Sequence, residues 1–347
     1  MTRALALGGT GPIGREIARR LSAAGWHVDV TGRNAAHMPP ELAAGGVRFI
    51  EADRADDTQL RTALGDGADL LVDCICYTAA DARLLLPLAK NATSTALISS
   101  RAVYVDSHGN HANSDVQPSF DGPIHETQPT MAPGDMDYDS REGYGANKVA
   151  AERVALDSGL PITVVRPSLV HGVGAACPRE WVFVKRVLDR REAVLLAHQG
   201  AGIVQPTAAA NIAALVKTIA ARPGTRILNC ADPDAPSALE ISRVVSRHLG
   251  HTWEEVLLDE TAPDTLGRTP WDSPCPVVLD MSAAEDLGYR PAGDYAAMVT
   301  AEIDWLVDTA RAGSWSRMDA SHFSLCFDYA TEDEFLARRR RTEAGQP

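Results

Sequence analysis

Three side chains near the middle of the chain have the types and the spacing needed to move a proton to or from a carbonyl oxygen. Tyr144 and Lys148 are four residues apart in a stretch with a helical pattern, so they share one helix face. A phenol has a pKa of about 10, and a neighbouring ammonium group favours its ionised form. Ser100 ends an apolar run, and its hydroxyl would hold the same substrate oxygen as Tyr144. The alternative is an ordinary pair on a helix surface, because Tyr-x-x-x-Lys is common by chance.

A glycine-rich segment near the start of the chain is typical of a site that binds a dinucleotide. It follows a short apolar run at 4–7 and leads directly into an amphipathic helical pattern. Glycine tolerates positive φ and leaves backbone N–H groups open, and the positive end of the new helix faces the phosphates. The other interpretation is a tight turn without a ligand. The cofactor residues expected here are Gly8, Thr10, Gly11, Pro12, Ile13 and Gly14.

The residues after the second and third expected strands favour NADP, with NAD as the alternative. An NAD site usually has an acid at the tip of the second strand, but here Asp29 lies inside the strand and Arg33 follows its tip. A guanidinium at this place pairs well with a 2′-phosphate, and we expect Asn34 beside it. Asp53 and Arg54 end the third strand, where an acid accepts a hydrogen bond from adenine. Arg33 as a plain surface residue and Asp53 as a helix cap are the alternatives.

Alternation of strand and helix patterns predicts a Rossmann-type α/β fold, a doubly wound parallel sheet with helices on both faces. The ligand then lies beyond the carboxyl ends of the strands. Cys74 and Cys76 would share one face of the fourth strand. Strands are expected at 4–7, 28–31, 47–52, 70–76, 95–99, 162–165 and 226–230, and the main helices at 11–24, 58–64, 79–90, 144–156, 180–190, 208–221, 238–248 and 295–310.

Composition narrows the classes of partner. The 347 residues carry a net charge of −13, which argues against a protein that binds the phosphate backbone of nucleic acid. The basic run at 338–341 is interpreted as a solvated helix end. Six scattered cysteines without metal-type spacing predict free thiols and no metal site. The apolar runs are too short for a signal peptide or a membrane span, so we expect a cytoplasmic protein without a membrane partner.

Taken together, the motifs resemble the short-chain dehydrogenase/reductase superfamily, and within it the extended, NAD(P)-dependent epimerase/dehydratase family. The resemblance covers about residues 1–310. The motifs that carry it are Gly8-Gly-Thr-Gly-Pro-Ile-Gly14, Asp53-Arg54, Ser99-Ser-Arg-Ala-Val-Tyr104, Tyr144-Gly-Ala-Asn-Lys148, Val165-Arg-Pro-Ser168 and Leu287-Gly-Tyr-Arg-Pro291.

The resemblance implies an oxidoreductase or epimerase that moves a hydride between a nicotinamide and a carbonyl or alcohol of a small, sugar-like substrate. Ser100, Tyr144 and Lys148 match the family's catalytic set, and Tyr144 and Lys148 also contact the cofactor. Further cofactor contacts are expected at Cys76, Pro167, Ser168 and Val170. The expected dinucleotide-binding domain is 1–170 with 203–230. A smaller α/β substrate domain takes 171–202 with 231–330, and 331–347 form a tail. Homodimers are common in the family.

Three departures from the family pattern limit what the resemblance implies. His171 replaces a tyrosine, and we favour a packing role over a substrate contact. Asn211 stands in a segment that lacks the usual acids, where it caps or links. Arg101 and Ala102 replace the acid pair of sugar dehydratases, so dehydration is disfavoured. The alternative function is a non-catalytic nucleotide sensor or an RNA-associated protein, for which an intact catalytic set would be superfluous.

Overall fold

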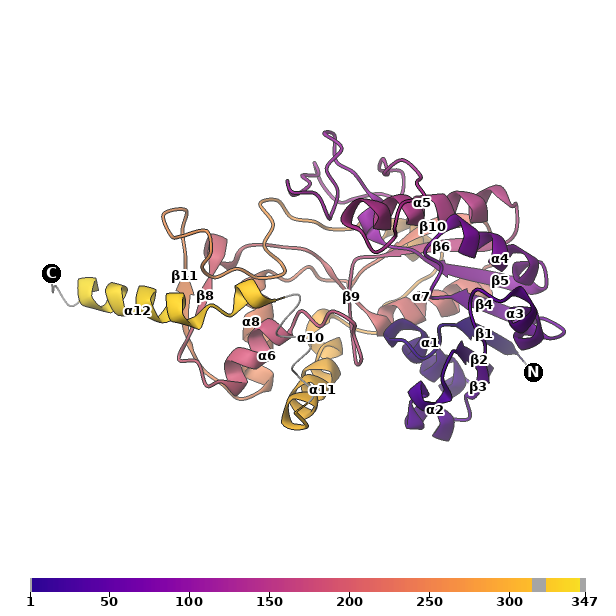
Figure 1. Ribbon diagram of the computed structural model, residues 1–347, viewed down its shortest axis with the longest axis horizontal. Coiled ribbons are helices and arrows are strands. Elements are labelled where there is room, and N and C mark those ends of the chain that lie inside the picture. Colours follow the sequence, from indigo (N-terminus) through magenta and orange to yellow (C-terminus); the bar gives the residue numbers. More distant parts are fainter. Residues whose placement is uncertain (1, 314–322, 344–347) are drawn as a thin grey trace.

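The computed structural model describes residues 2–313 and 323–343 (Figure 1). Residues 314–322 of the expected substrate domain and 344–347 of the expected tail lie outside the described residues. The molecule is elongated, with a large sheet at one end and the C-terminal helix at the other. Within the described residues, no helix combines the length and the apolar character that crossing a bilayer requires.

A seven-stranded parallel sheet organises the larger lobe of the described chain. Its strand order is β10-β6-β5-β4-β1-β2-β3, so the chain reverses direction across the sheet between β1 and β4. The central strands are buried on both faces, as expected of a parallel sheet between two helix layers. The predicted doubly wound α/β fold is confirmed. The strands are β1 (Arg3–Leu7), β2 (His27–Gly32), β3 (Arg48–Glu51), β4 (Ala68–Asp73), β5 (Ala92–Ile98), β6 (Ile162–Pro167) and β10 (Arg226–Cys230).

Side chains of the sheet alternate between two helix layers. Ala4 and Ala6 of β1 belong to one apolar cluster with α1 and α7, whereas Leu5 and Leu7 belong to another with α3, α4 and α5. This period of two is what a strand covered on both faces requires. The covering helices are α1 (Pro12–Ala23), α7 (Ala209–Ala221), α3 (Asp57–Leu64), α4 (Ala79–Ala89) and α5 (Arg141–Asp157), and the short α2 (Pro40–Ala44) precedes β3.

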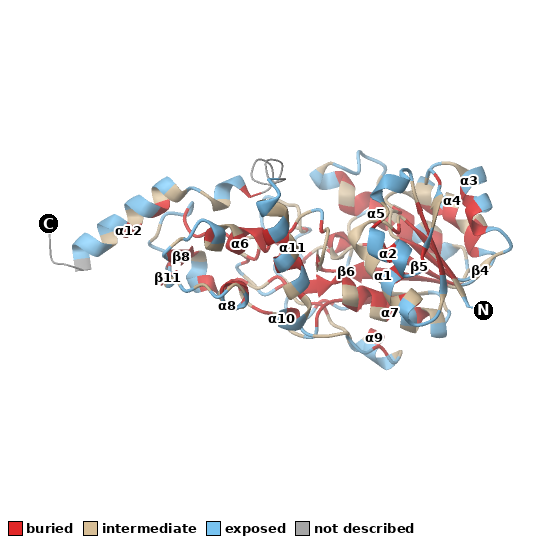
Figure 2. Cartoon of the chain, turned by 90° about the horizontal axis from the view of Figure 1, so that it is seen from below, coloured by how far each residue is buried: buried red, intermediate tan, exposed pale blue. Residues whose placement is uncertain are grey.

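A smaller lobe is built from segments of the second half of the chain. The parallel pair β8 (Ala193–Leu196) and β11 (Glu254–Leu257) is covered by helices, and Phe183 stacks on Trp271 in its core. Figure 2 shows that the C-terminal helix is mostly exposed. The division of the chain into two domains stays a prediction. The remaining elements are α6 (Trp181–Leu188), α8 (Ala238–His248), α9 (Ser282–Asp286), α10 (Tyr295–Met298), α11 (Thr300–Arg311), α12 (Tyr329–Glu343), and the pair β7 (Leu169–His171) and β9 (Pro206–Ala208).

The structure corrects several predicted elements. β4 ends at Asp73, whose carboxylate accepts a hydrogen bond from the Ile75 N–H at 3.0 Å, so Cys74 and Cys76 follow the strand instead of sharing one of its faces. The helix predicted at 295–310 is divided into α10 and α11. The predicted tail contains α12, which includes the basic run at 338–341. The strands β7, β8, β9 and β11 were missed because runs of three or four residues show no clear period.

Candidate active site

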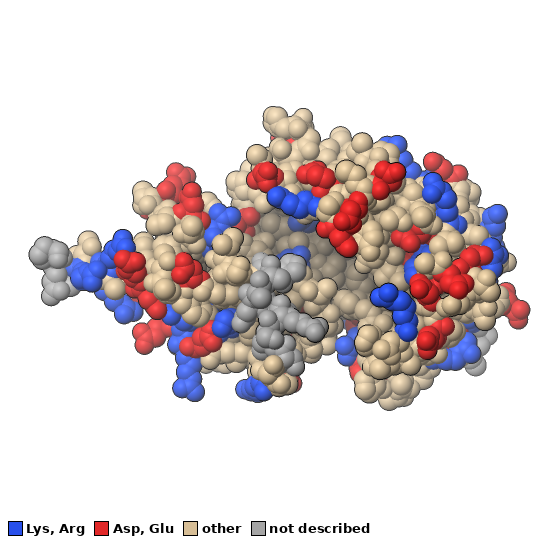
Figure 3. Space-filling view, in the orientation of Figure 1, with Lys and Arg blue, Asp and Glu red and all other residues tan. Residues whose placement is uncertain are grey.

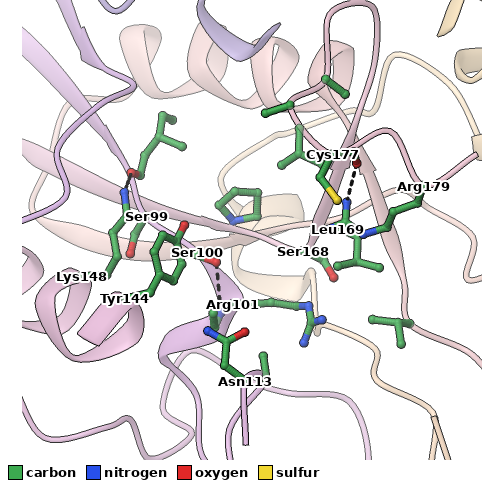
Figure 4. Close-up of a pocket in the computed structure, with 18 of the residues that line it drawn as sticks. Ser99, Ser100, Arg101, Asn113, Tyr144, Lys148, Ser168, Leu169, Cys177 and Arg179 are labelled. Atoms are coloured by element: carbon green, nitrogen blue, oxygen red, sulfur yellow. Dashed lines mark hydrogen bonds between the residues drawn. The ribbon is translucent and has the colours of Figure 1, made fainter. Parts of the chain in front are cut away.

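A cavity of about 560 Å³ opens at the carboxyl ends of β4, β5 and β6. The space-filling view is hollowed near the middle of the molecule, between the two lobes (Figure 3). The cavity is lined by residues that are far apart in the sequence, which the close-up in Figure 4 shows together. They include Pro12, Ile13, Ser100, Arg101, Tyr144, Lys148, Pro167, Ser168, Val170 and Arg179.

The two serines after β5 have different surroundings. Ser99 is buried, and its hydroxyl donates a 2.5 Å hydrogen bond to the Glu152 carboxylate, which also pairs with Arg166. Ser100 caps the short helix η2 (Arg101–Val103), and its Oγ accepts a hydrogen bond from the Ala102 N–H at 3.1 Å. The Ser100 hydroxyl proton therefore stays free to be donated into the cavity.

Tyr144 and Lys148 lie on the same side of α5 and both line the cavity, as their spacing predicted. Lys148 is buried, and its Nζ lies 6.0 Å from the centre of the Tyr144 ring. The ammonium donates hydrogen bonds to the carbonyl oxygens of Cys76 at 2.8 Å and Ile98 at 3.1 Å. Within the described residues it has no carboxylate partner. Two carbonyl groups therefore hold the ammonium in place, and no acid neutralises its charge.

A second phenol lines the same cavity and was missed at the sequence level. Tyr77 follows β4, and its ring lies 4.4 Å below the Lys148 ammonium and stacks on Tyr138 at 5.3 Å. Burial, together with the neighbouring Tyr144, raises the pKa of Tyr77 to about 12. Tyr77 is therefore a poor proton donor and stays un-ionised, and it forms one wall of the lysine site. No spacing rule links it to Lys148, because the contact is made across two elements.

The glycine turn forms a cradle that side chains would fill. Gly8 has a φ of +72°, which favours glycine. A Cβ on Gly14 would lie 2.6 Å from the Gly8 carbonyl oxygen, so α1 can approach the turn this closely only because position 14 is glycine. α1 begins at Pro12 after Gly11, with no side-chain cap and no acid in its first turn. The turn therefore fits a dinucleotide pyrophosphate, with Thr10 and Ile13 beside it.

The residues predicted around the adenosine half lie near the ends of β2 and β3. Arg33 is exposed just after β2, and among the described residues its guanidinium has no ion-pair partner. Asn34 caps a short helical turn by accepting from the Ala36 N–H at 2.9 Å. The Asp53 carboxylate accepts a hydrogen bond from the Ala55 N–H at 2.9 Å.

Two charged side chains of this region form ion pairs within the protein instead of facing open space. Arg54 pairs with Asp73 at 2.5 Å and donates to the Asp81 carbonyl, while its Nη1 has no partner in the described part of the chain. Asp29 is fully buried and pairs with Arg3 and Arg48. Asp29 is therefore not available to a ribose hydroxyl, as its place inside the strand suggested.

The residues expected at the nicotinamide end divide into two groups. Pro167, Ser168 and Val170 line the cavity, and the Ser168 hydroxyl is buried without a partner among the described residues. The Cys76 thiol packs in the apolar layer under α4 and α5, so only its carbonyl oxygen reaches the site, where it binds Lys148. The cysteines that line the cavity are Cys74 and Cys177.

Two other polar residues, His171 and Asn211, do not line this cavity. His171 is buried, its Nε2 lies 2.8 Å from Asp232, and its ring packs edge-on against Tyr295. Asn211 donates to the same Asp232 carboxylate at 2.7 Å and accepts from the Ala292 N–H, so it links α7 to the chain before α10. Asn211 thus connects a helix of the larger lobe to segments of the smaller one, whereas His171 packs among segments of the smaller lobe.

The first half of the chain is similar to a known family of NAD(P)H-binding proteins. Residues 8–172 match the family model described as NAD(P)H-binding. Over 178 residues, half of this chain and 44% of the relative, the sequence is 29% identical to a 2′-dehydrokanamycin reductase of Streptomyces kanamyceticus. The aligned part thus spans less than half the length of that curated relative.

Solved structures with the same fold include epimerases. A UDP-glucose 4-epimerase of Thermotoga maritima, with UDP-glucose, superposes with a TM-score of 0.64 and 16% identity, covering 89% of this chain and 100% of that chain. The WbmH enzyme of Bordetella bronchiseptica, in complex with NAD+, gives a TM-score of 0.67 and 17% identity, covering 89% and 99%. Residues 8–172 thus match an NAD(P)H-binding family model, and the fold of the chain is that of these enzymes.

Proposed function

We propose that this protein is an NADP-dependent reductase or epimerase that moves a hydride to or from a carbonyl or alcohol carbon of a small substrate. The observation that carries the proposal is the convergence of Ser100, Tyr144 and Lys148 on one cavity at the end of the sheet that also receives the glycine turn. The three side chains come from two elements that are about 40 residues apart along the chain, so a chance surface pair does not explain their meeting.

Each residue of the set has a separate task. When bound, the nicotinamide supplies or accepts the hydride. Tyr144 gives a proton to the carbonyl oxygen, or removes it from the alcohol, and Ser100 donates a hydrogen bond to the same oxygen. Lys148, held by two carbonyl groups, places a positive charge that favours the negative charge developing on the Tyr144 oxygen. Pro12, Pro167 and Val170 supply apolar cavity wall that keeps water away.

The preference for NADP follows from the charges beside β2. Arg33 is an exposed guanidinium without an ion pair among the described residues, and the carboxylate of Asp29 is buried in pairs with other arginines. A 2′-phosphate would therefore meet an available cation and no available acid. We expect Arg33→Gln to weaken NADPH binding about tenfold, in line with the loss of one charge-assisted hydrogen bond, and to leave NADH binding within about threefold. An unchanged NADPH to NADH ratio in fluorescence titrations would remove Arg33 from the site.

The assigned proton donor is tested by comparing two phenols of the same cavity. NADPH consumption is measured with a panel of carbonyl compounds and sugar nucleotides, for the wild type, Tyr144→Phe and Tyr77→Phe. Loss of a positioned general acid lowers kcat about 10²–10⁴-fold, so Tyr144→Phe should fall by at least about 10²-fold with an unchanged Kd for NADPH. Tyr77→Phe should retain activity within about threefold. Full turnover by Tyr144→Phe, or a larger loss in Tyr77→Phe, would contradict the assignment.

A further inference from the structure

The cavity is positively charged although the whole chain is acidic. Its lining contains Arg101, Lys148 and Arg179, and within the described residues Asp272 is its sole acid. The chain as a whole has a net charge of −13. Lys148 is accounted for by the proposed hydride transfer, whereas the two arginines have no task in it. These two guanidinium groups need another explanation.

Arg101 follows Ser100 directly, so its guanidinium lies close to the reacting end of the site. The side chain is half-buried, and its Nε is fully buried without a hydrogen-bond partner. Across the described parts of the chain, no carboxylate lies within 4.0 Å of it. Burial and the neighbouring Arg179 lower the pKa of Arg101 to about 10, so it stays charged at neutral pH. A partly buried cation without a partner loses hydration that a bound anion would compensate.

Arg179 reaches the same space from the opposite side of the cavity, from the loop before α6 (Figure 4). Its Nη1 donates a long hydrogen bond of 3.4 Å to the Cys177 carbonyl, and none of the described residues forms an ion pair with it. Glu302 of α11 interacts with it electrostatically, but that carboxyl is buried and accepts a hydrogen bond from the Gly172 N–H. The side chain therefore keeps most of its donors for the cavity.

The acid of the cavity does not neutralise either arginine. Asp272 pairs with Arg268 at 2.9 Å and accepts hydrogen bonds from the N–H and the hydroxyl of Thr269, at 3.0 and 2.8 Å. Both of its oxygens are thereby used. A guanidinium fork matches the oxygens of a carboxylate or phosphate group, and two forks facing one space can share one such group.

We propose that the substrate carries an acidic group, a carboxylate or a phosphate, next to the reacting carbonyl, and that Arg101 and Arg179 bind this group. The inference rests on the proposed hydride transfer at Ser100 and Tyr144, and it names the substrate class of that site. It also disfavours substrates with several amino groups, because their ammonium charges would face two guanidinium groups without an available carboxylate.

Binding without turnover tests this inference separately from the hydride transfer. The protein is saturated with NADP+ at constant ionic strength and titrated by calorimetry with malonate, its neutral analogue malonamide, and inorganic phosphate. We expect the wild type to bind malonate or phosphate at least tenfold more tightly than malonamide. Whichever of the two anions binds more tightly identifies the carboxylate or the phosphate as the group recognised.

Variants of the two arginines identify the binding residues. Arg101→Gln and Arg179→Gln should each weaken anion binding at least tenfold, and the double variant should lose the preference for anion over malonamide, with NADP+ affinity unchanged. Arg101→Lys, which keeps the charge and loses the fork, should bind with intermediate affinity. Arg247→Gln, an exposed position on α8, controls for the change in net charge.

Two results would overturn the inference: no preference for either anion in the wild type, or the same preference in the double variant. Because no reaction takes place, these outcomes do not depend on Tyr144. Failure of Tyr144→Phe to lower turnover would reject the proposed hydride chemistry while leaving the anion measurement interpretable.

Discussion

The buried carboxylate of Asp29 offers a sharp test of whether an acid on β2 serves stability or cofactor binding. It joins three neighbouring strands, because Arg3 of β1 and Arg48 of β3 both pair with it, at 2.7 Å each. Asp29→Asn removes the charge and leaves both guanidinium groups with a weaker acceptor. We therefore expect a loss of stability without a change in the preference between NADP and NAD.

The size of the loss follows from burial. The carboxylate is 0% exposed, whereas the side chains of Arg3 and Arg48 are 22% and 58% exposed. Breaking a fully buried pair costs about 3–5 kcal/mol and a surface pair about 0–1 kcal/mol, so a half-screened pair of this kind is expected to cost about 2 kcal/mol. Asp57→Asn is the matched control, because its pair with Arg61 is about half exposed on both sides and should cost about 0.5 kcal/mol or less.

The assay is urea unfolding followed by far-ultraviolet circular dichroism, together with fluorescence titration of NADPH and NADH. Burial alone would raise the pKa of Asp29, but hydrogen bonds from Arg48 and Arg3 outweigh it and hold the pKa below its usual value of 3.8. This stabilisation is complete above pH 3.8 and is lost as the pH falls through the lowered pKa, so Asp29→Asn should flatten the acid limb of the stability curve. Equal stability losses in both variants, or a changed cofactor preference, would refute the reasoning.

Three other predictions concern the cradle, a buried pair and pH. Gly14→Ala should weaken NADPH binding at least tenfold in fluorescence titration, because the new Cβ would lie 2.6 Å from backbone atoms of the turn; unchanged binding would rule out the close approach. Glu152→Gln leaves the buried Arg166 charge without an opposite charge and should lower the free energy of unfolding by about 3–5 kcal/mol in urea; a loss below about 1 kcal/mol would contradict this. Burial opposes protonation of His171, but Asp232 outweighs it and raises the pKa above 6.5. The protonated histidine therefore stabilises the fold fully below pH 6.5, and this contribution is lost as the pH rises through the raised pKa. His171→Gln should remove this pH dependence from thermal melts, and a persisting slope would assign it to another group.

The resemblance to extended short-chain dehydrogenases rests on local patterns that need no tertiary information. The glycine turn places its signal within seven consecutive residues, and the pair of Tyr144 and Lys148 lies within one helix turn. The alternation of strand and helix patterns predicted the doubly wound sheet, because the spacing of apolar residues shows which face of each segment is buried. The short strands β7, β8, β9 and β11 lacked such a signal, since three or four apolar residues fit a helix as well as a strand.

The sequence by itself determined the class of fold, the cofactor cradle and the candidate catalytic set, because each depends on residues close together in the chain. Only the tertiary structure decided which side chains face the cavity. In the folded chain the Cys76 thiol points into the apolar core. Arg101 and Arg179, which are nearly 80 residues apart in the sequence, line the same cavity. Neither arginine has a carboxylate partner among the described residues. Composition cannot predict this, since a chain with 46 acids has enough to pair every cation.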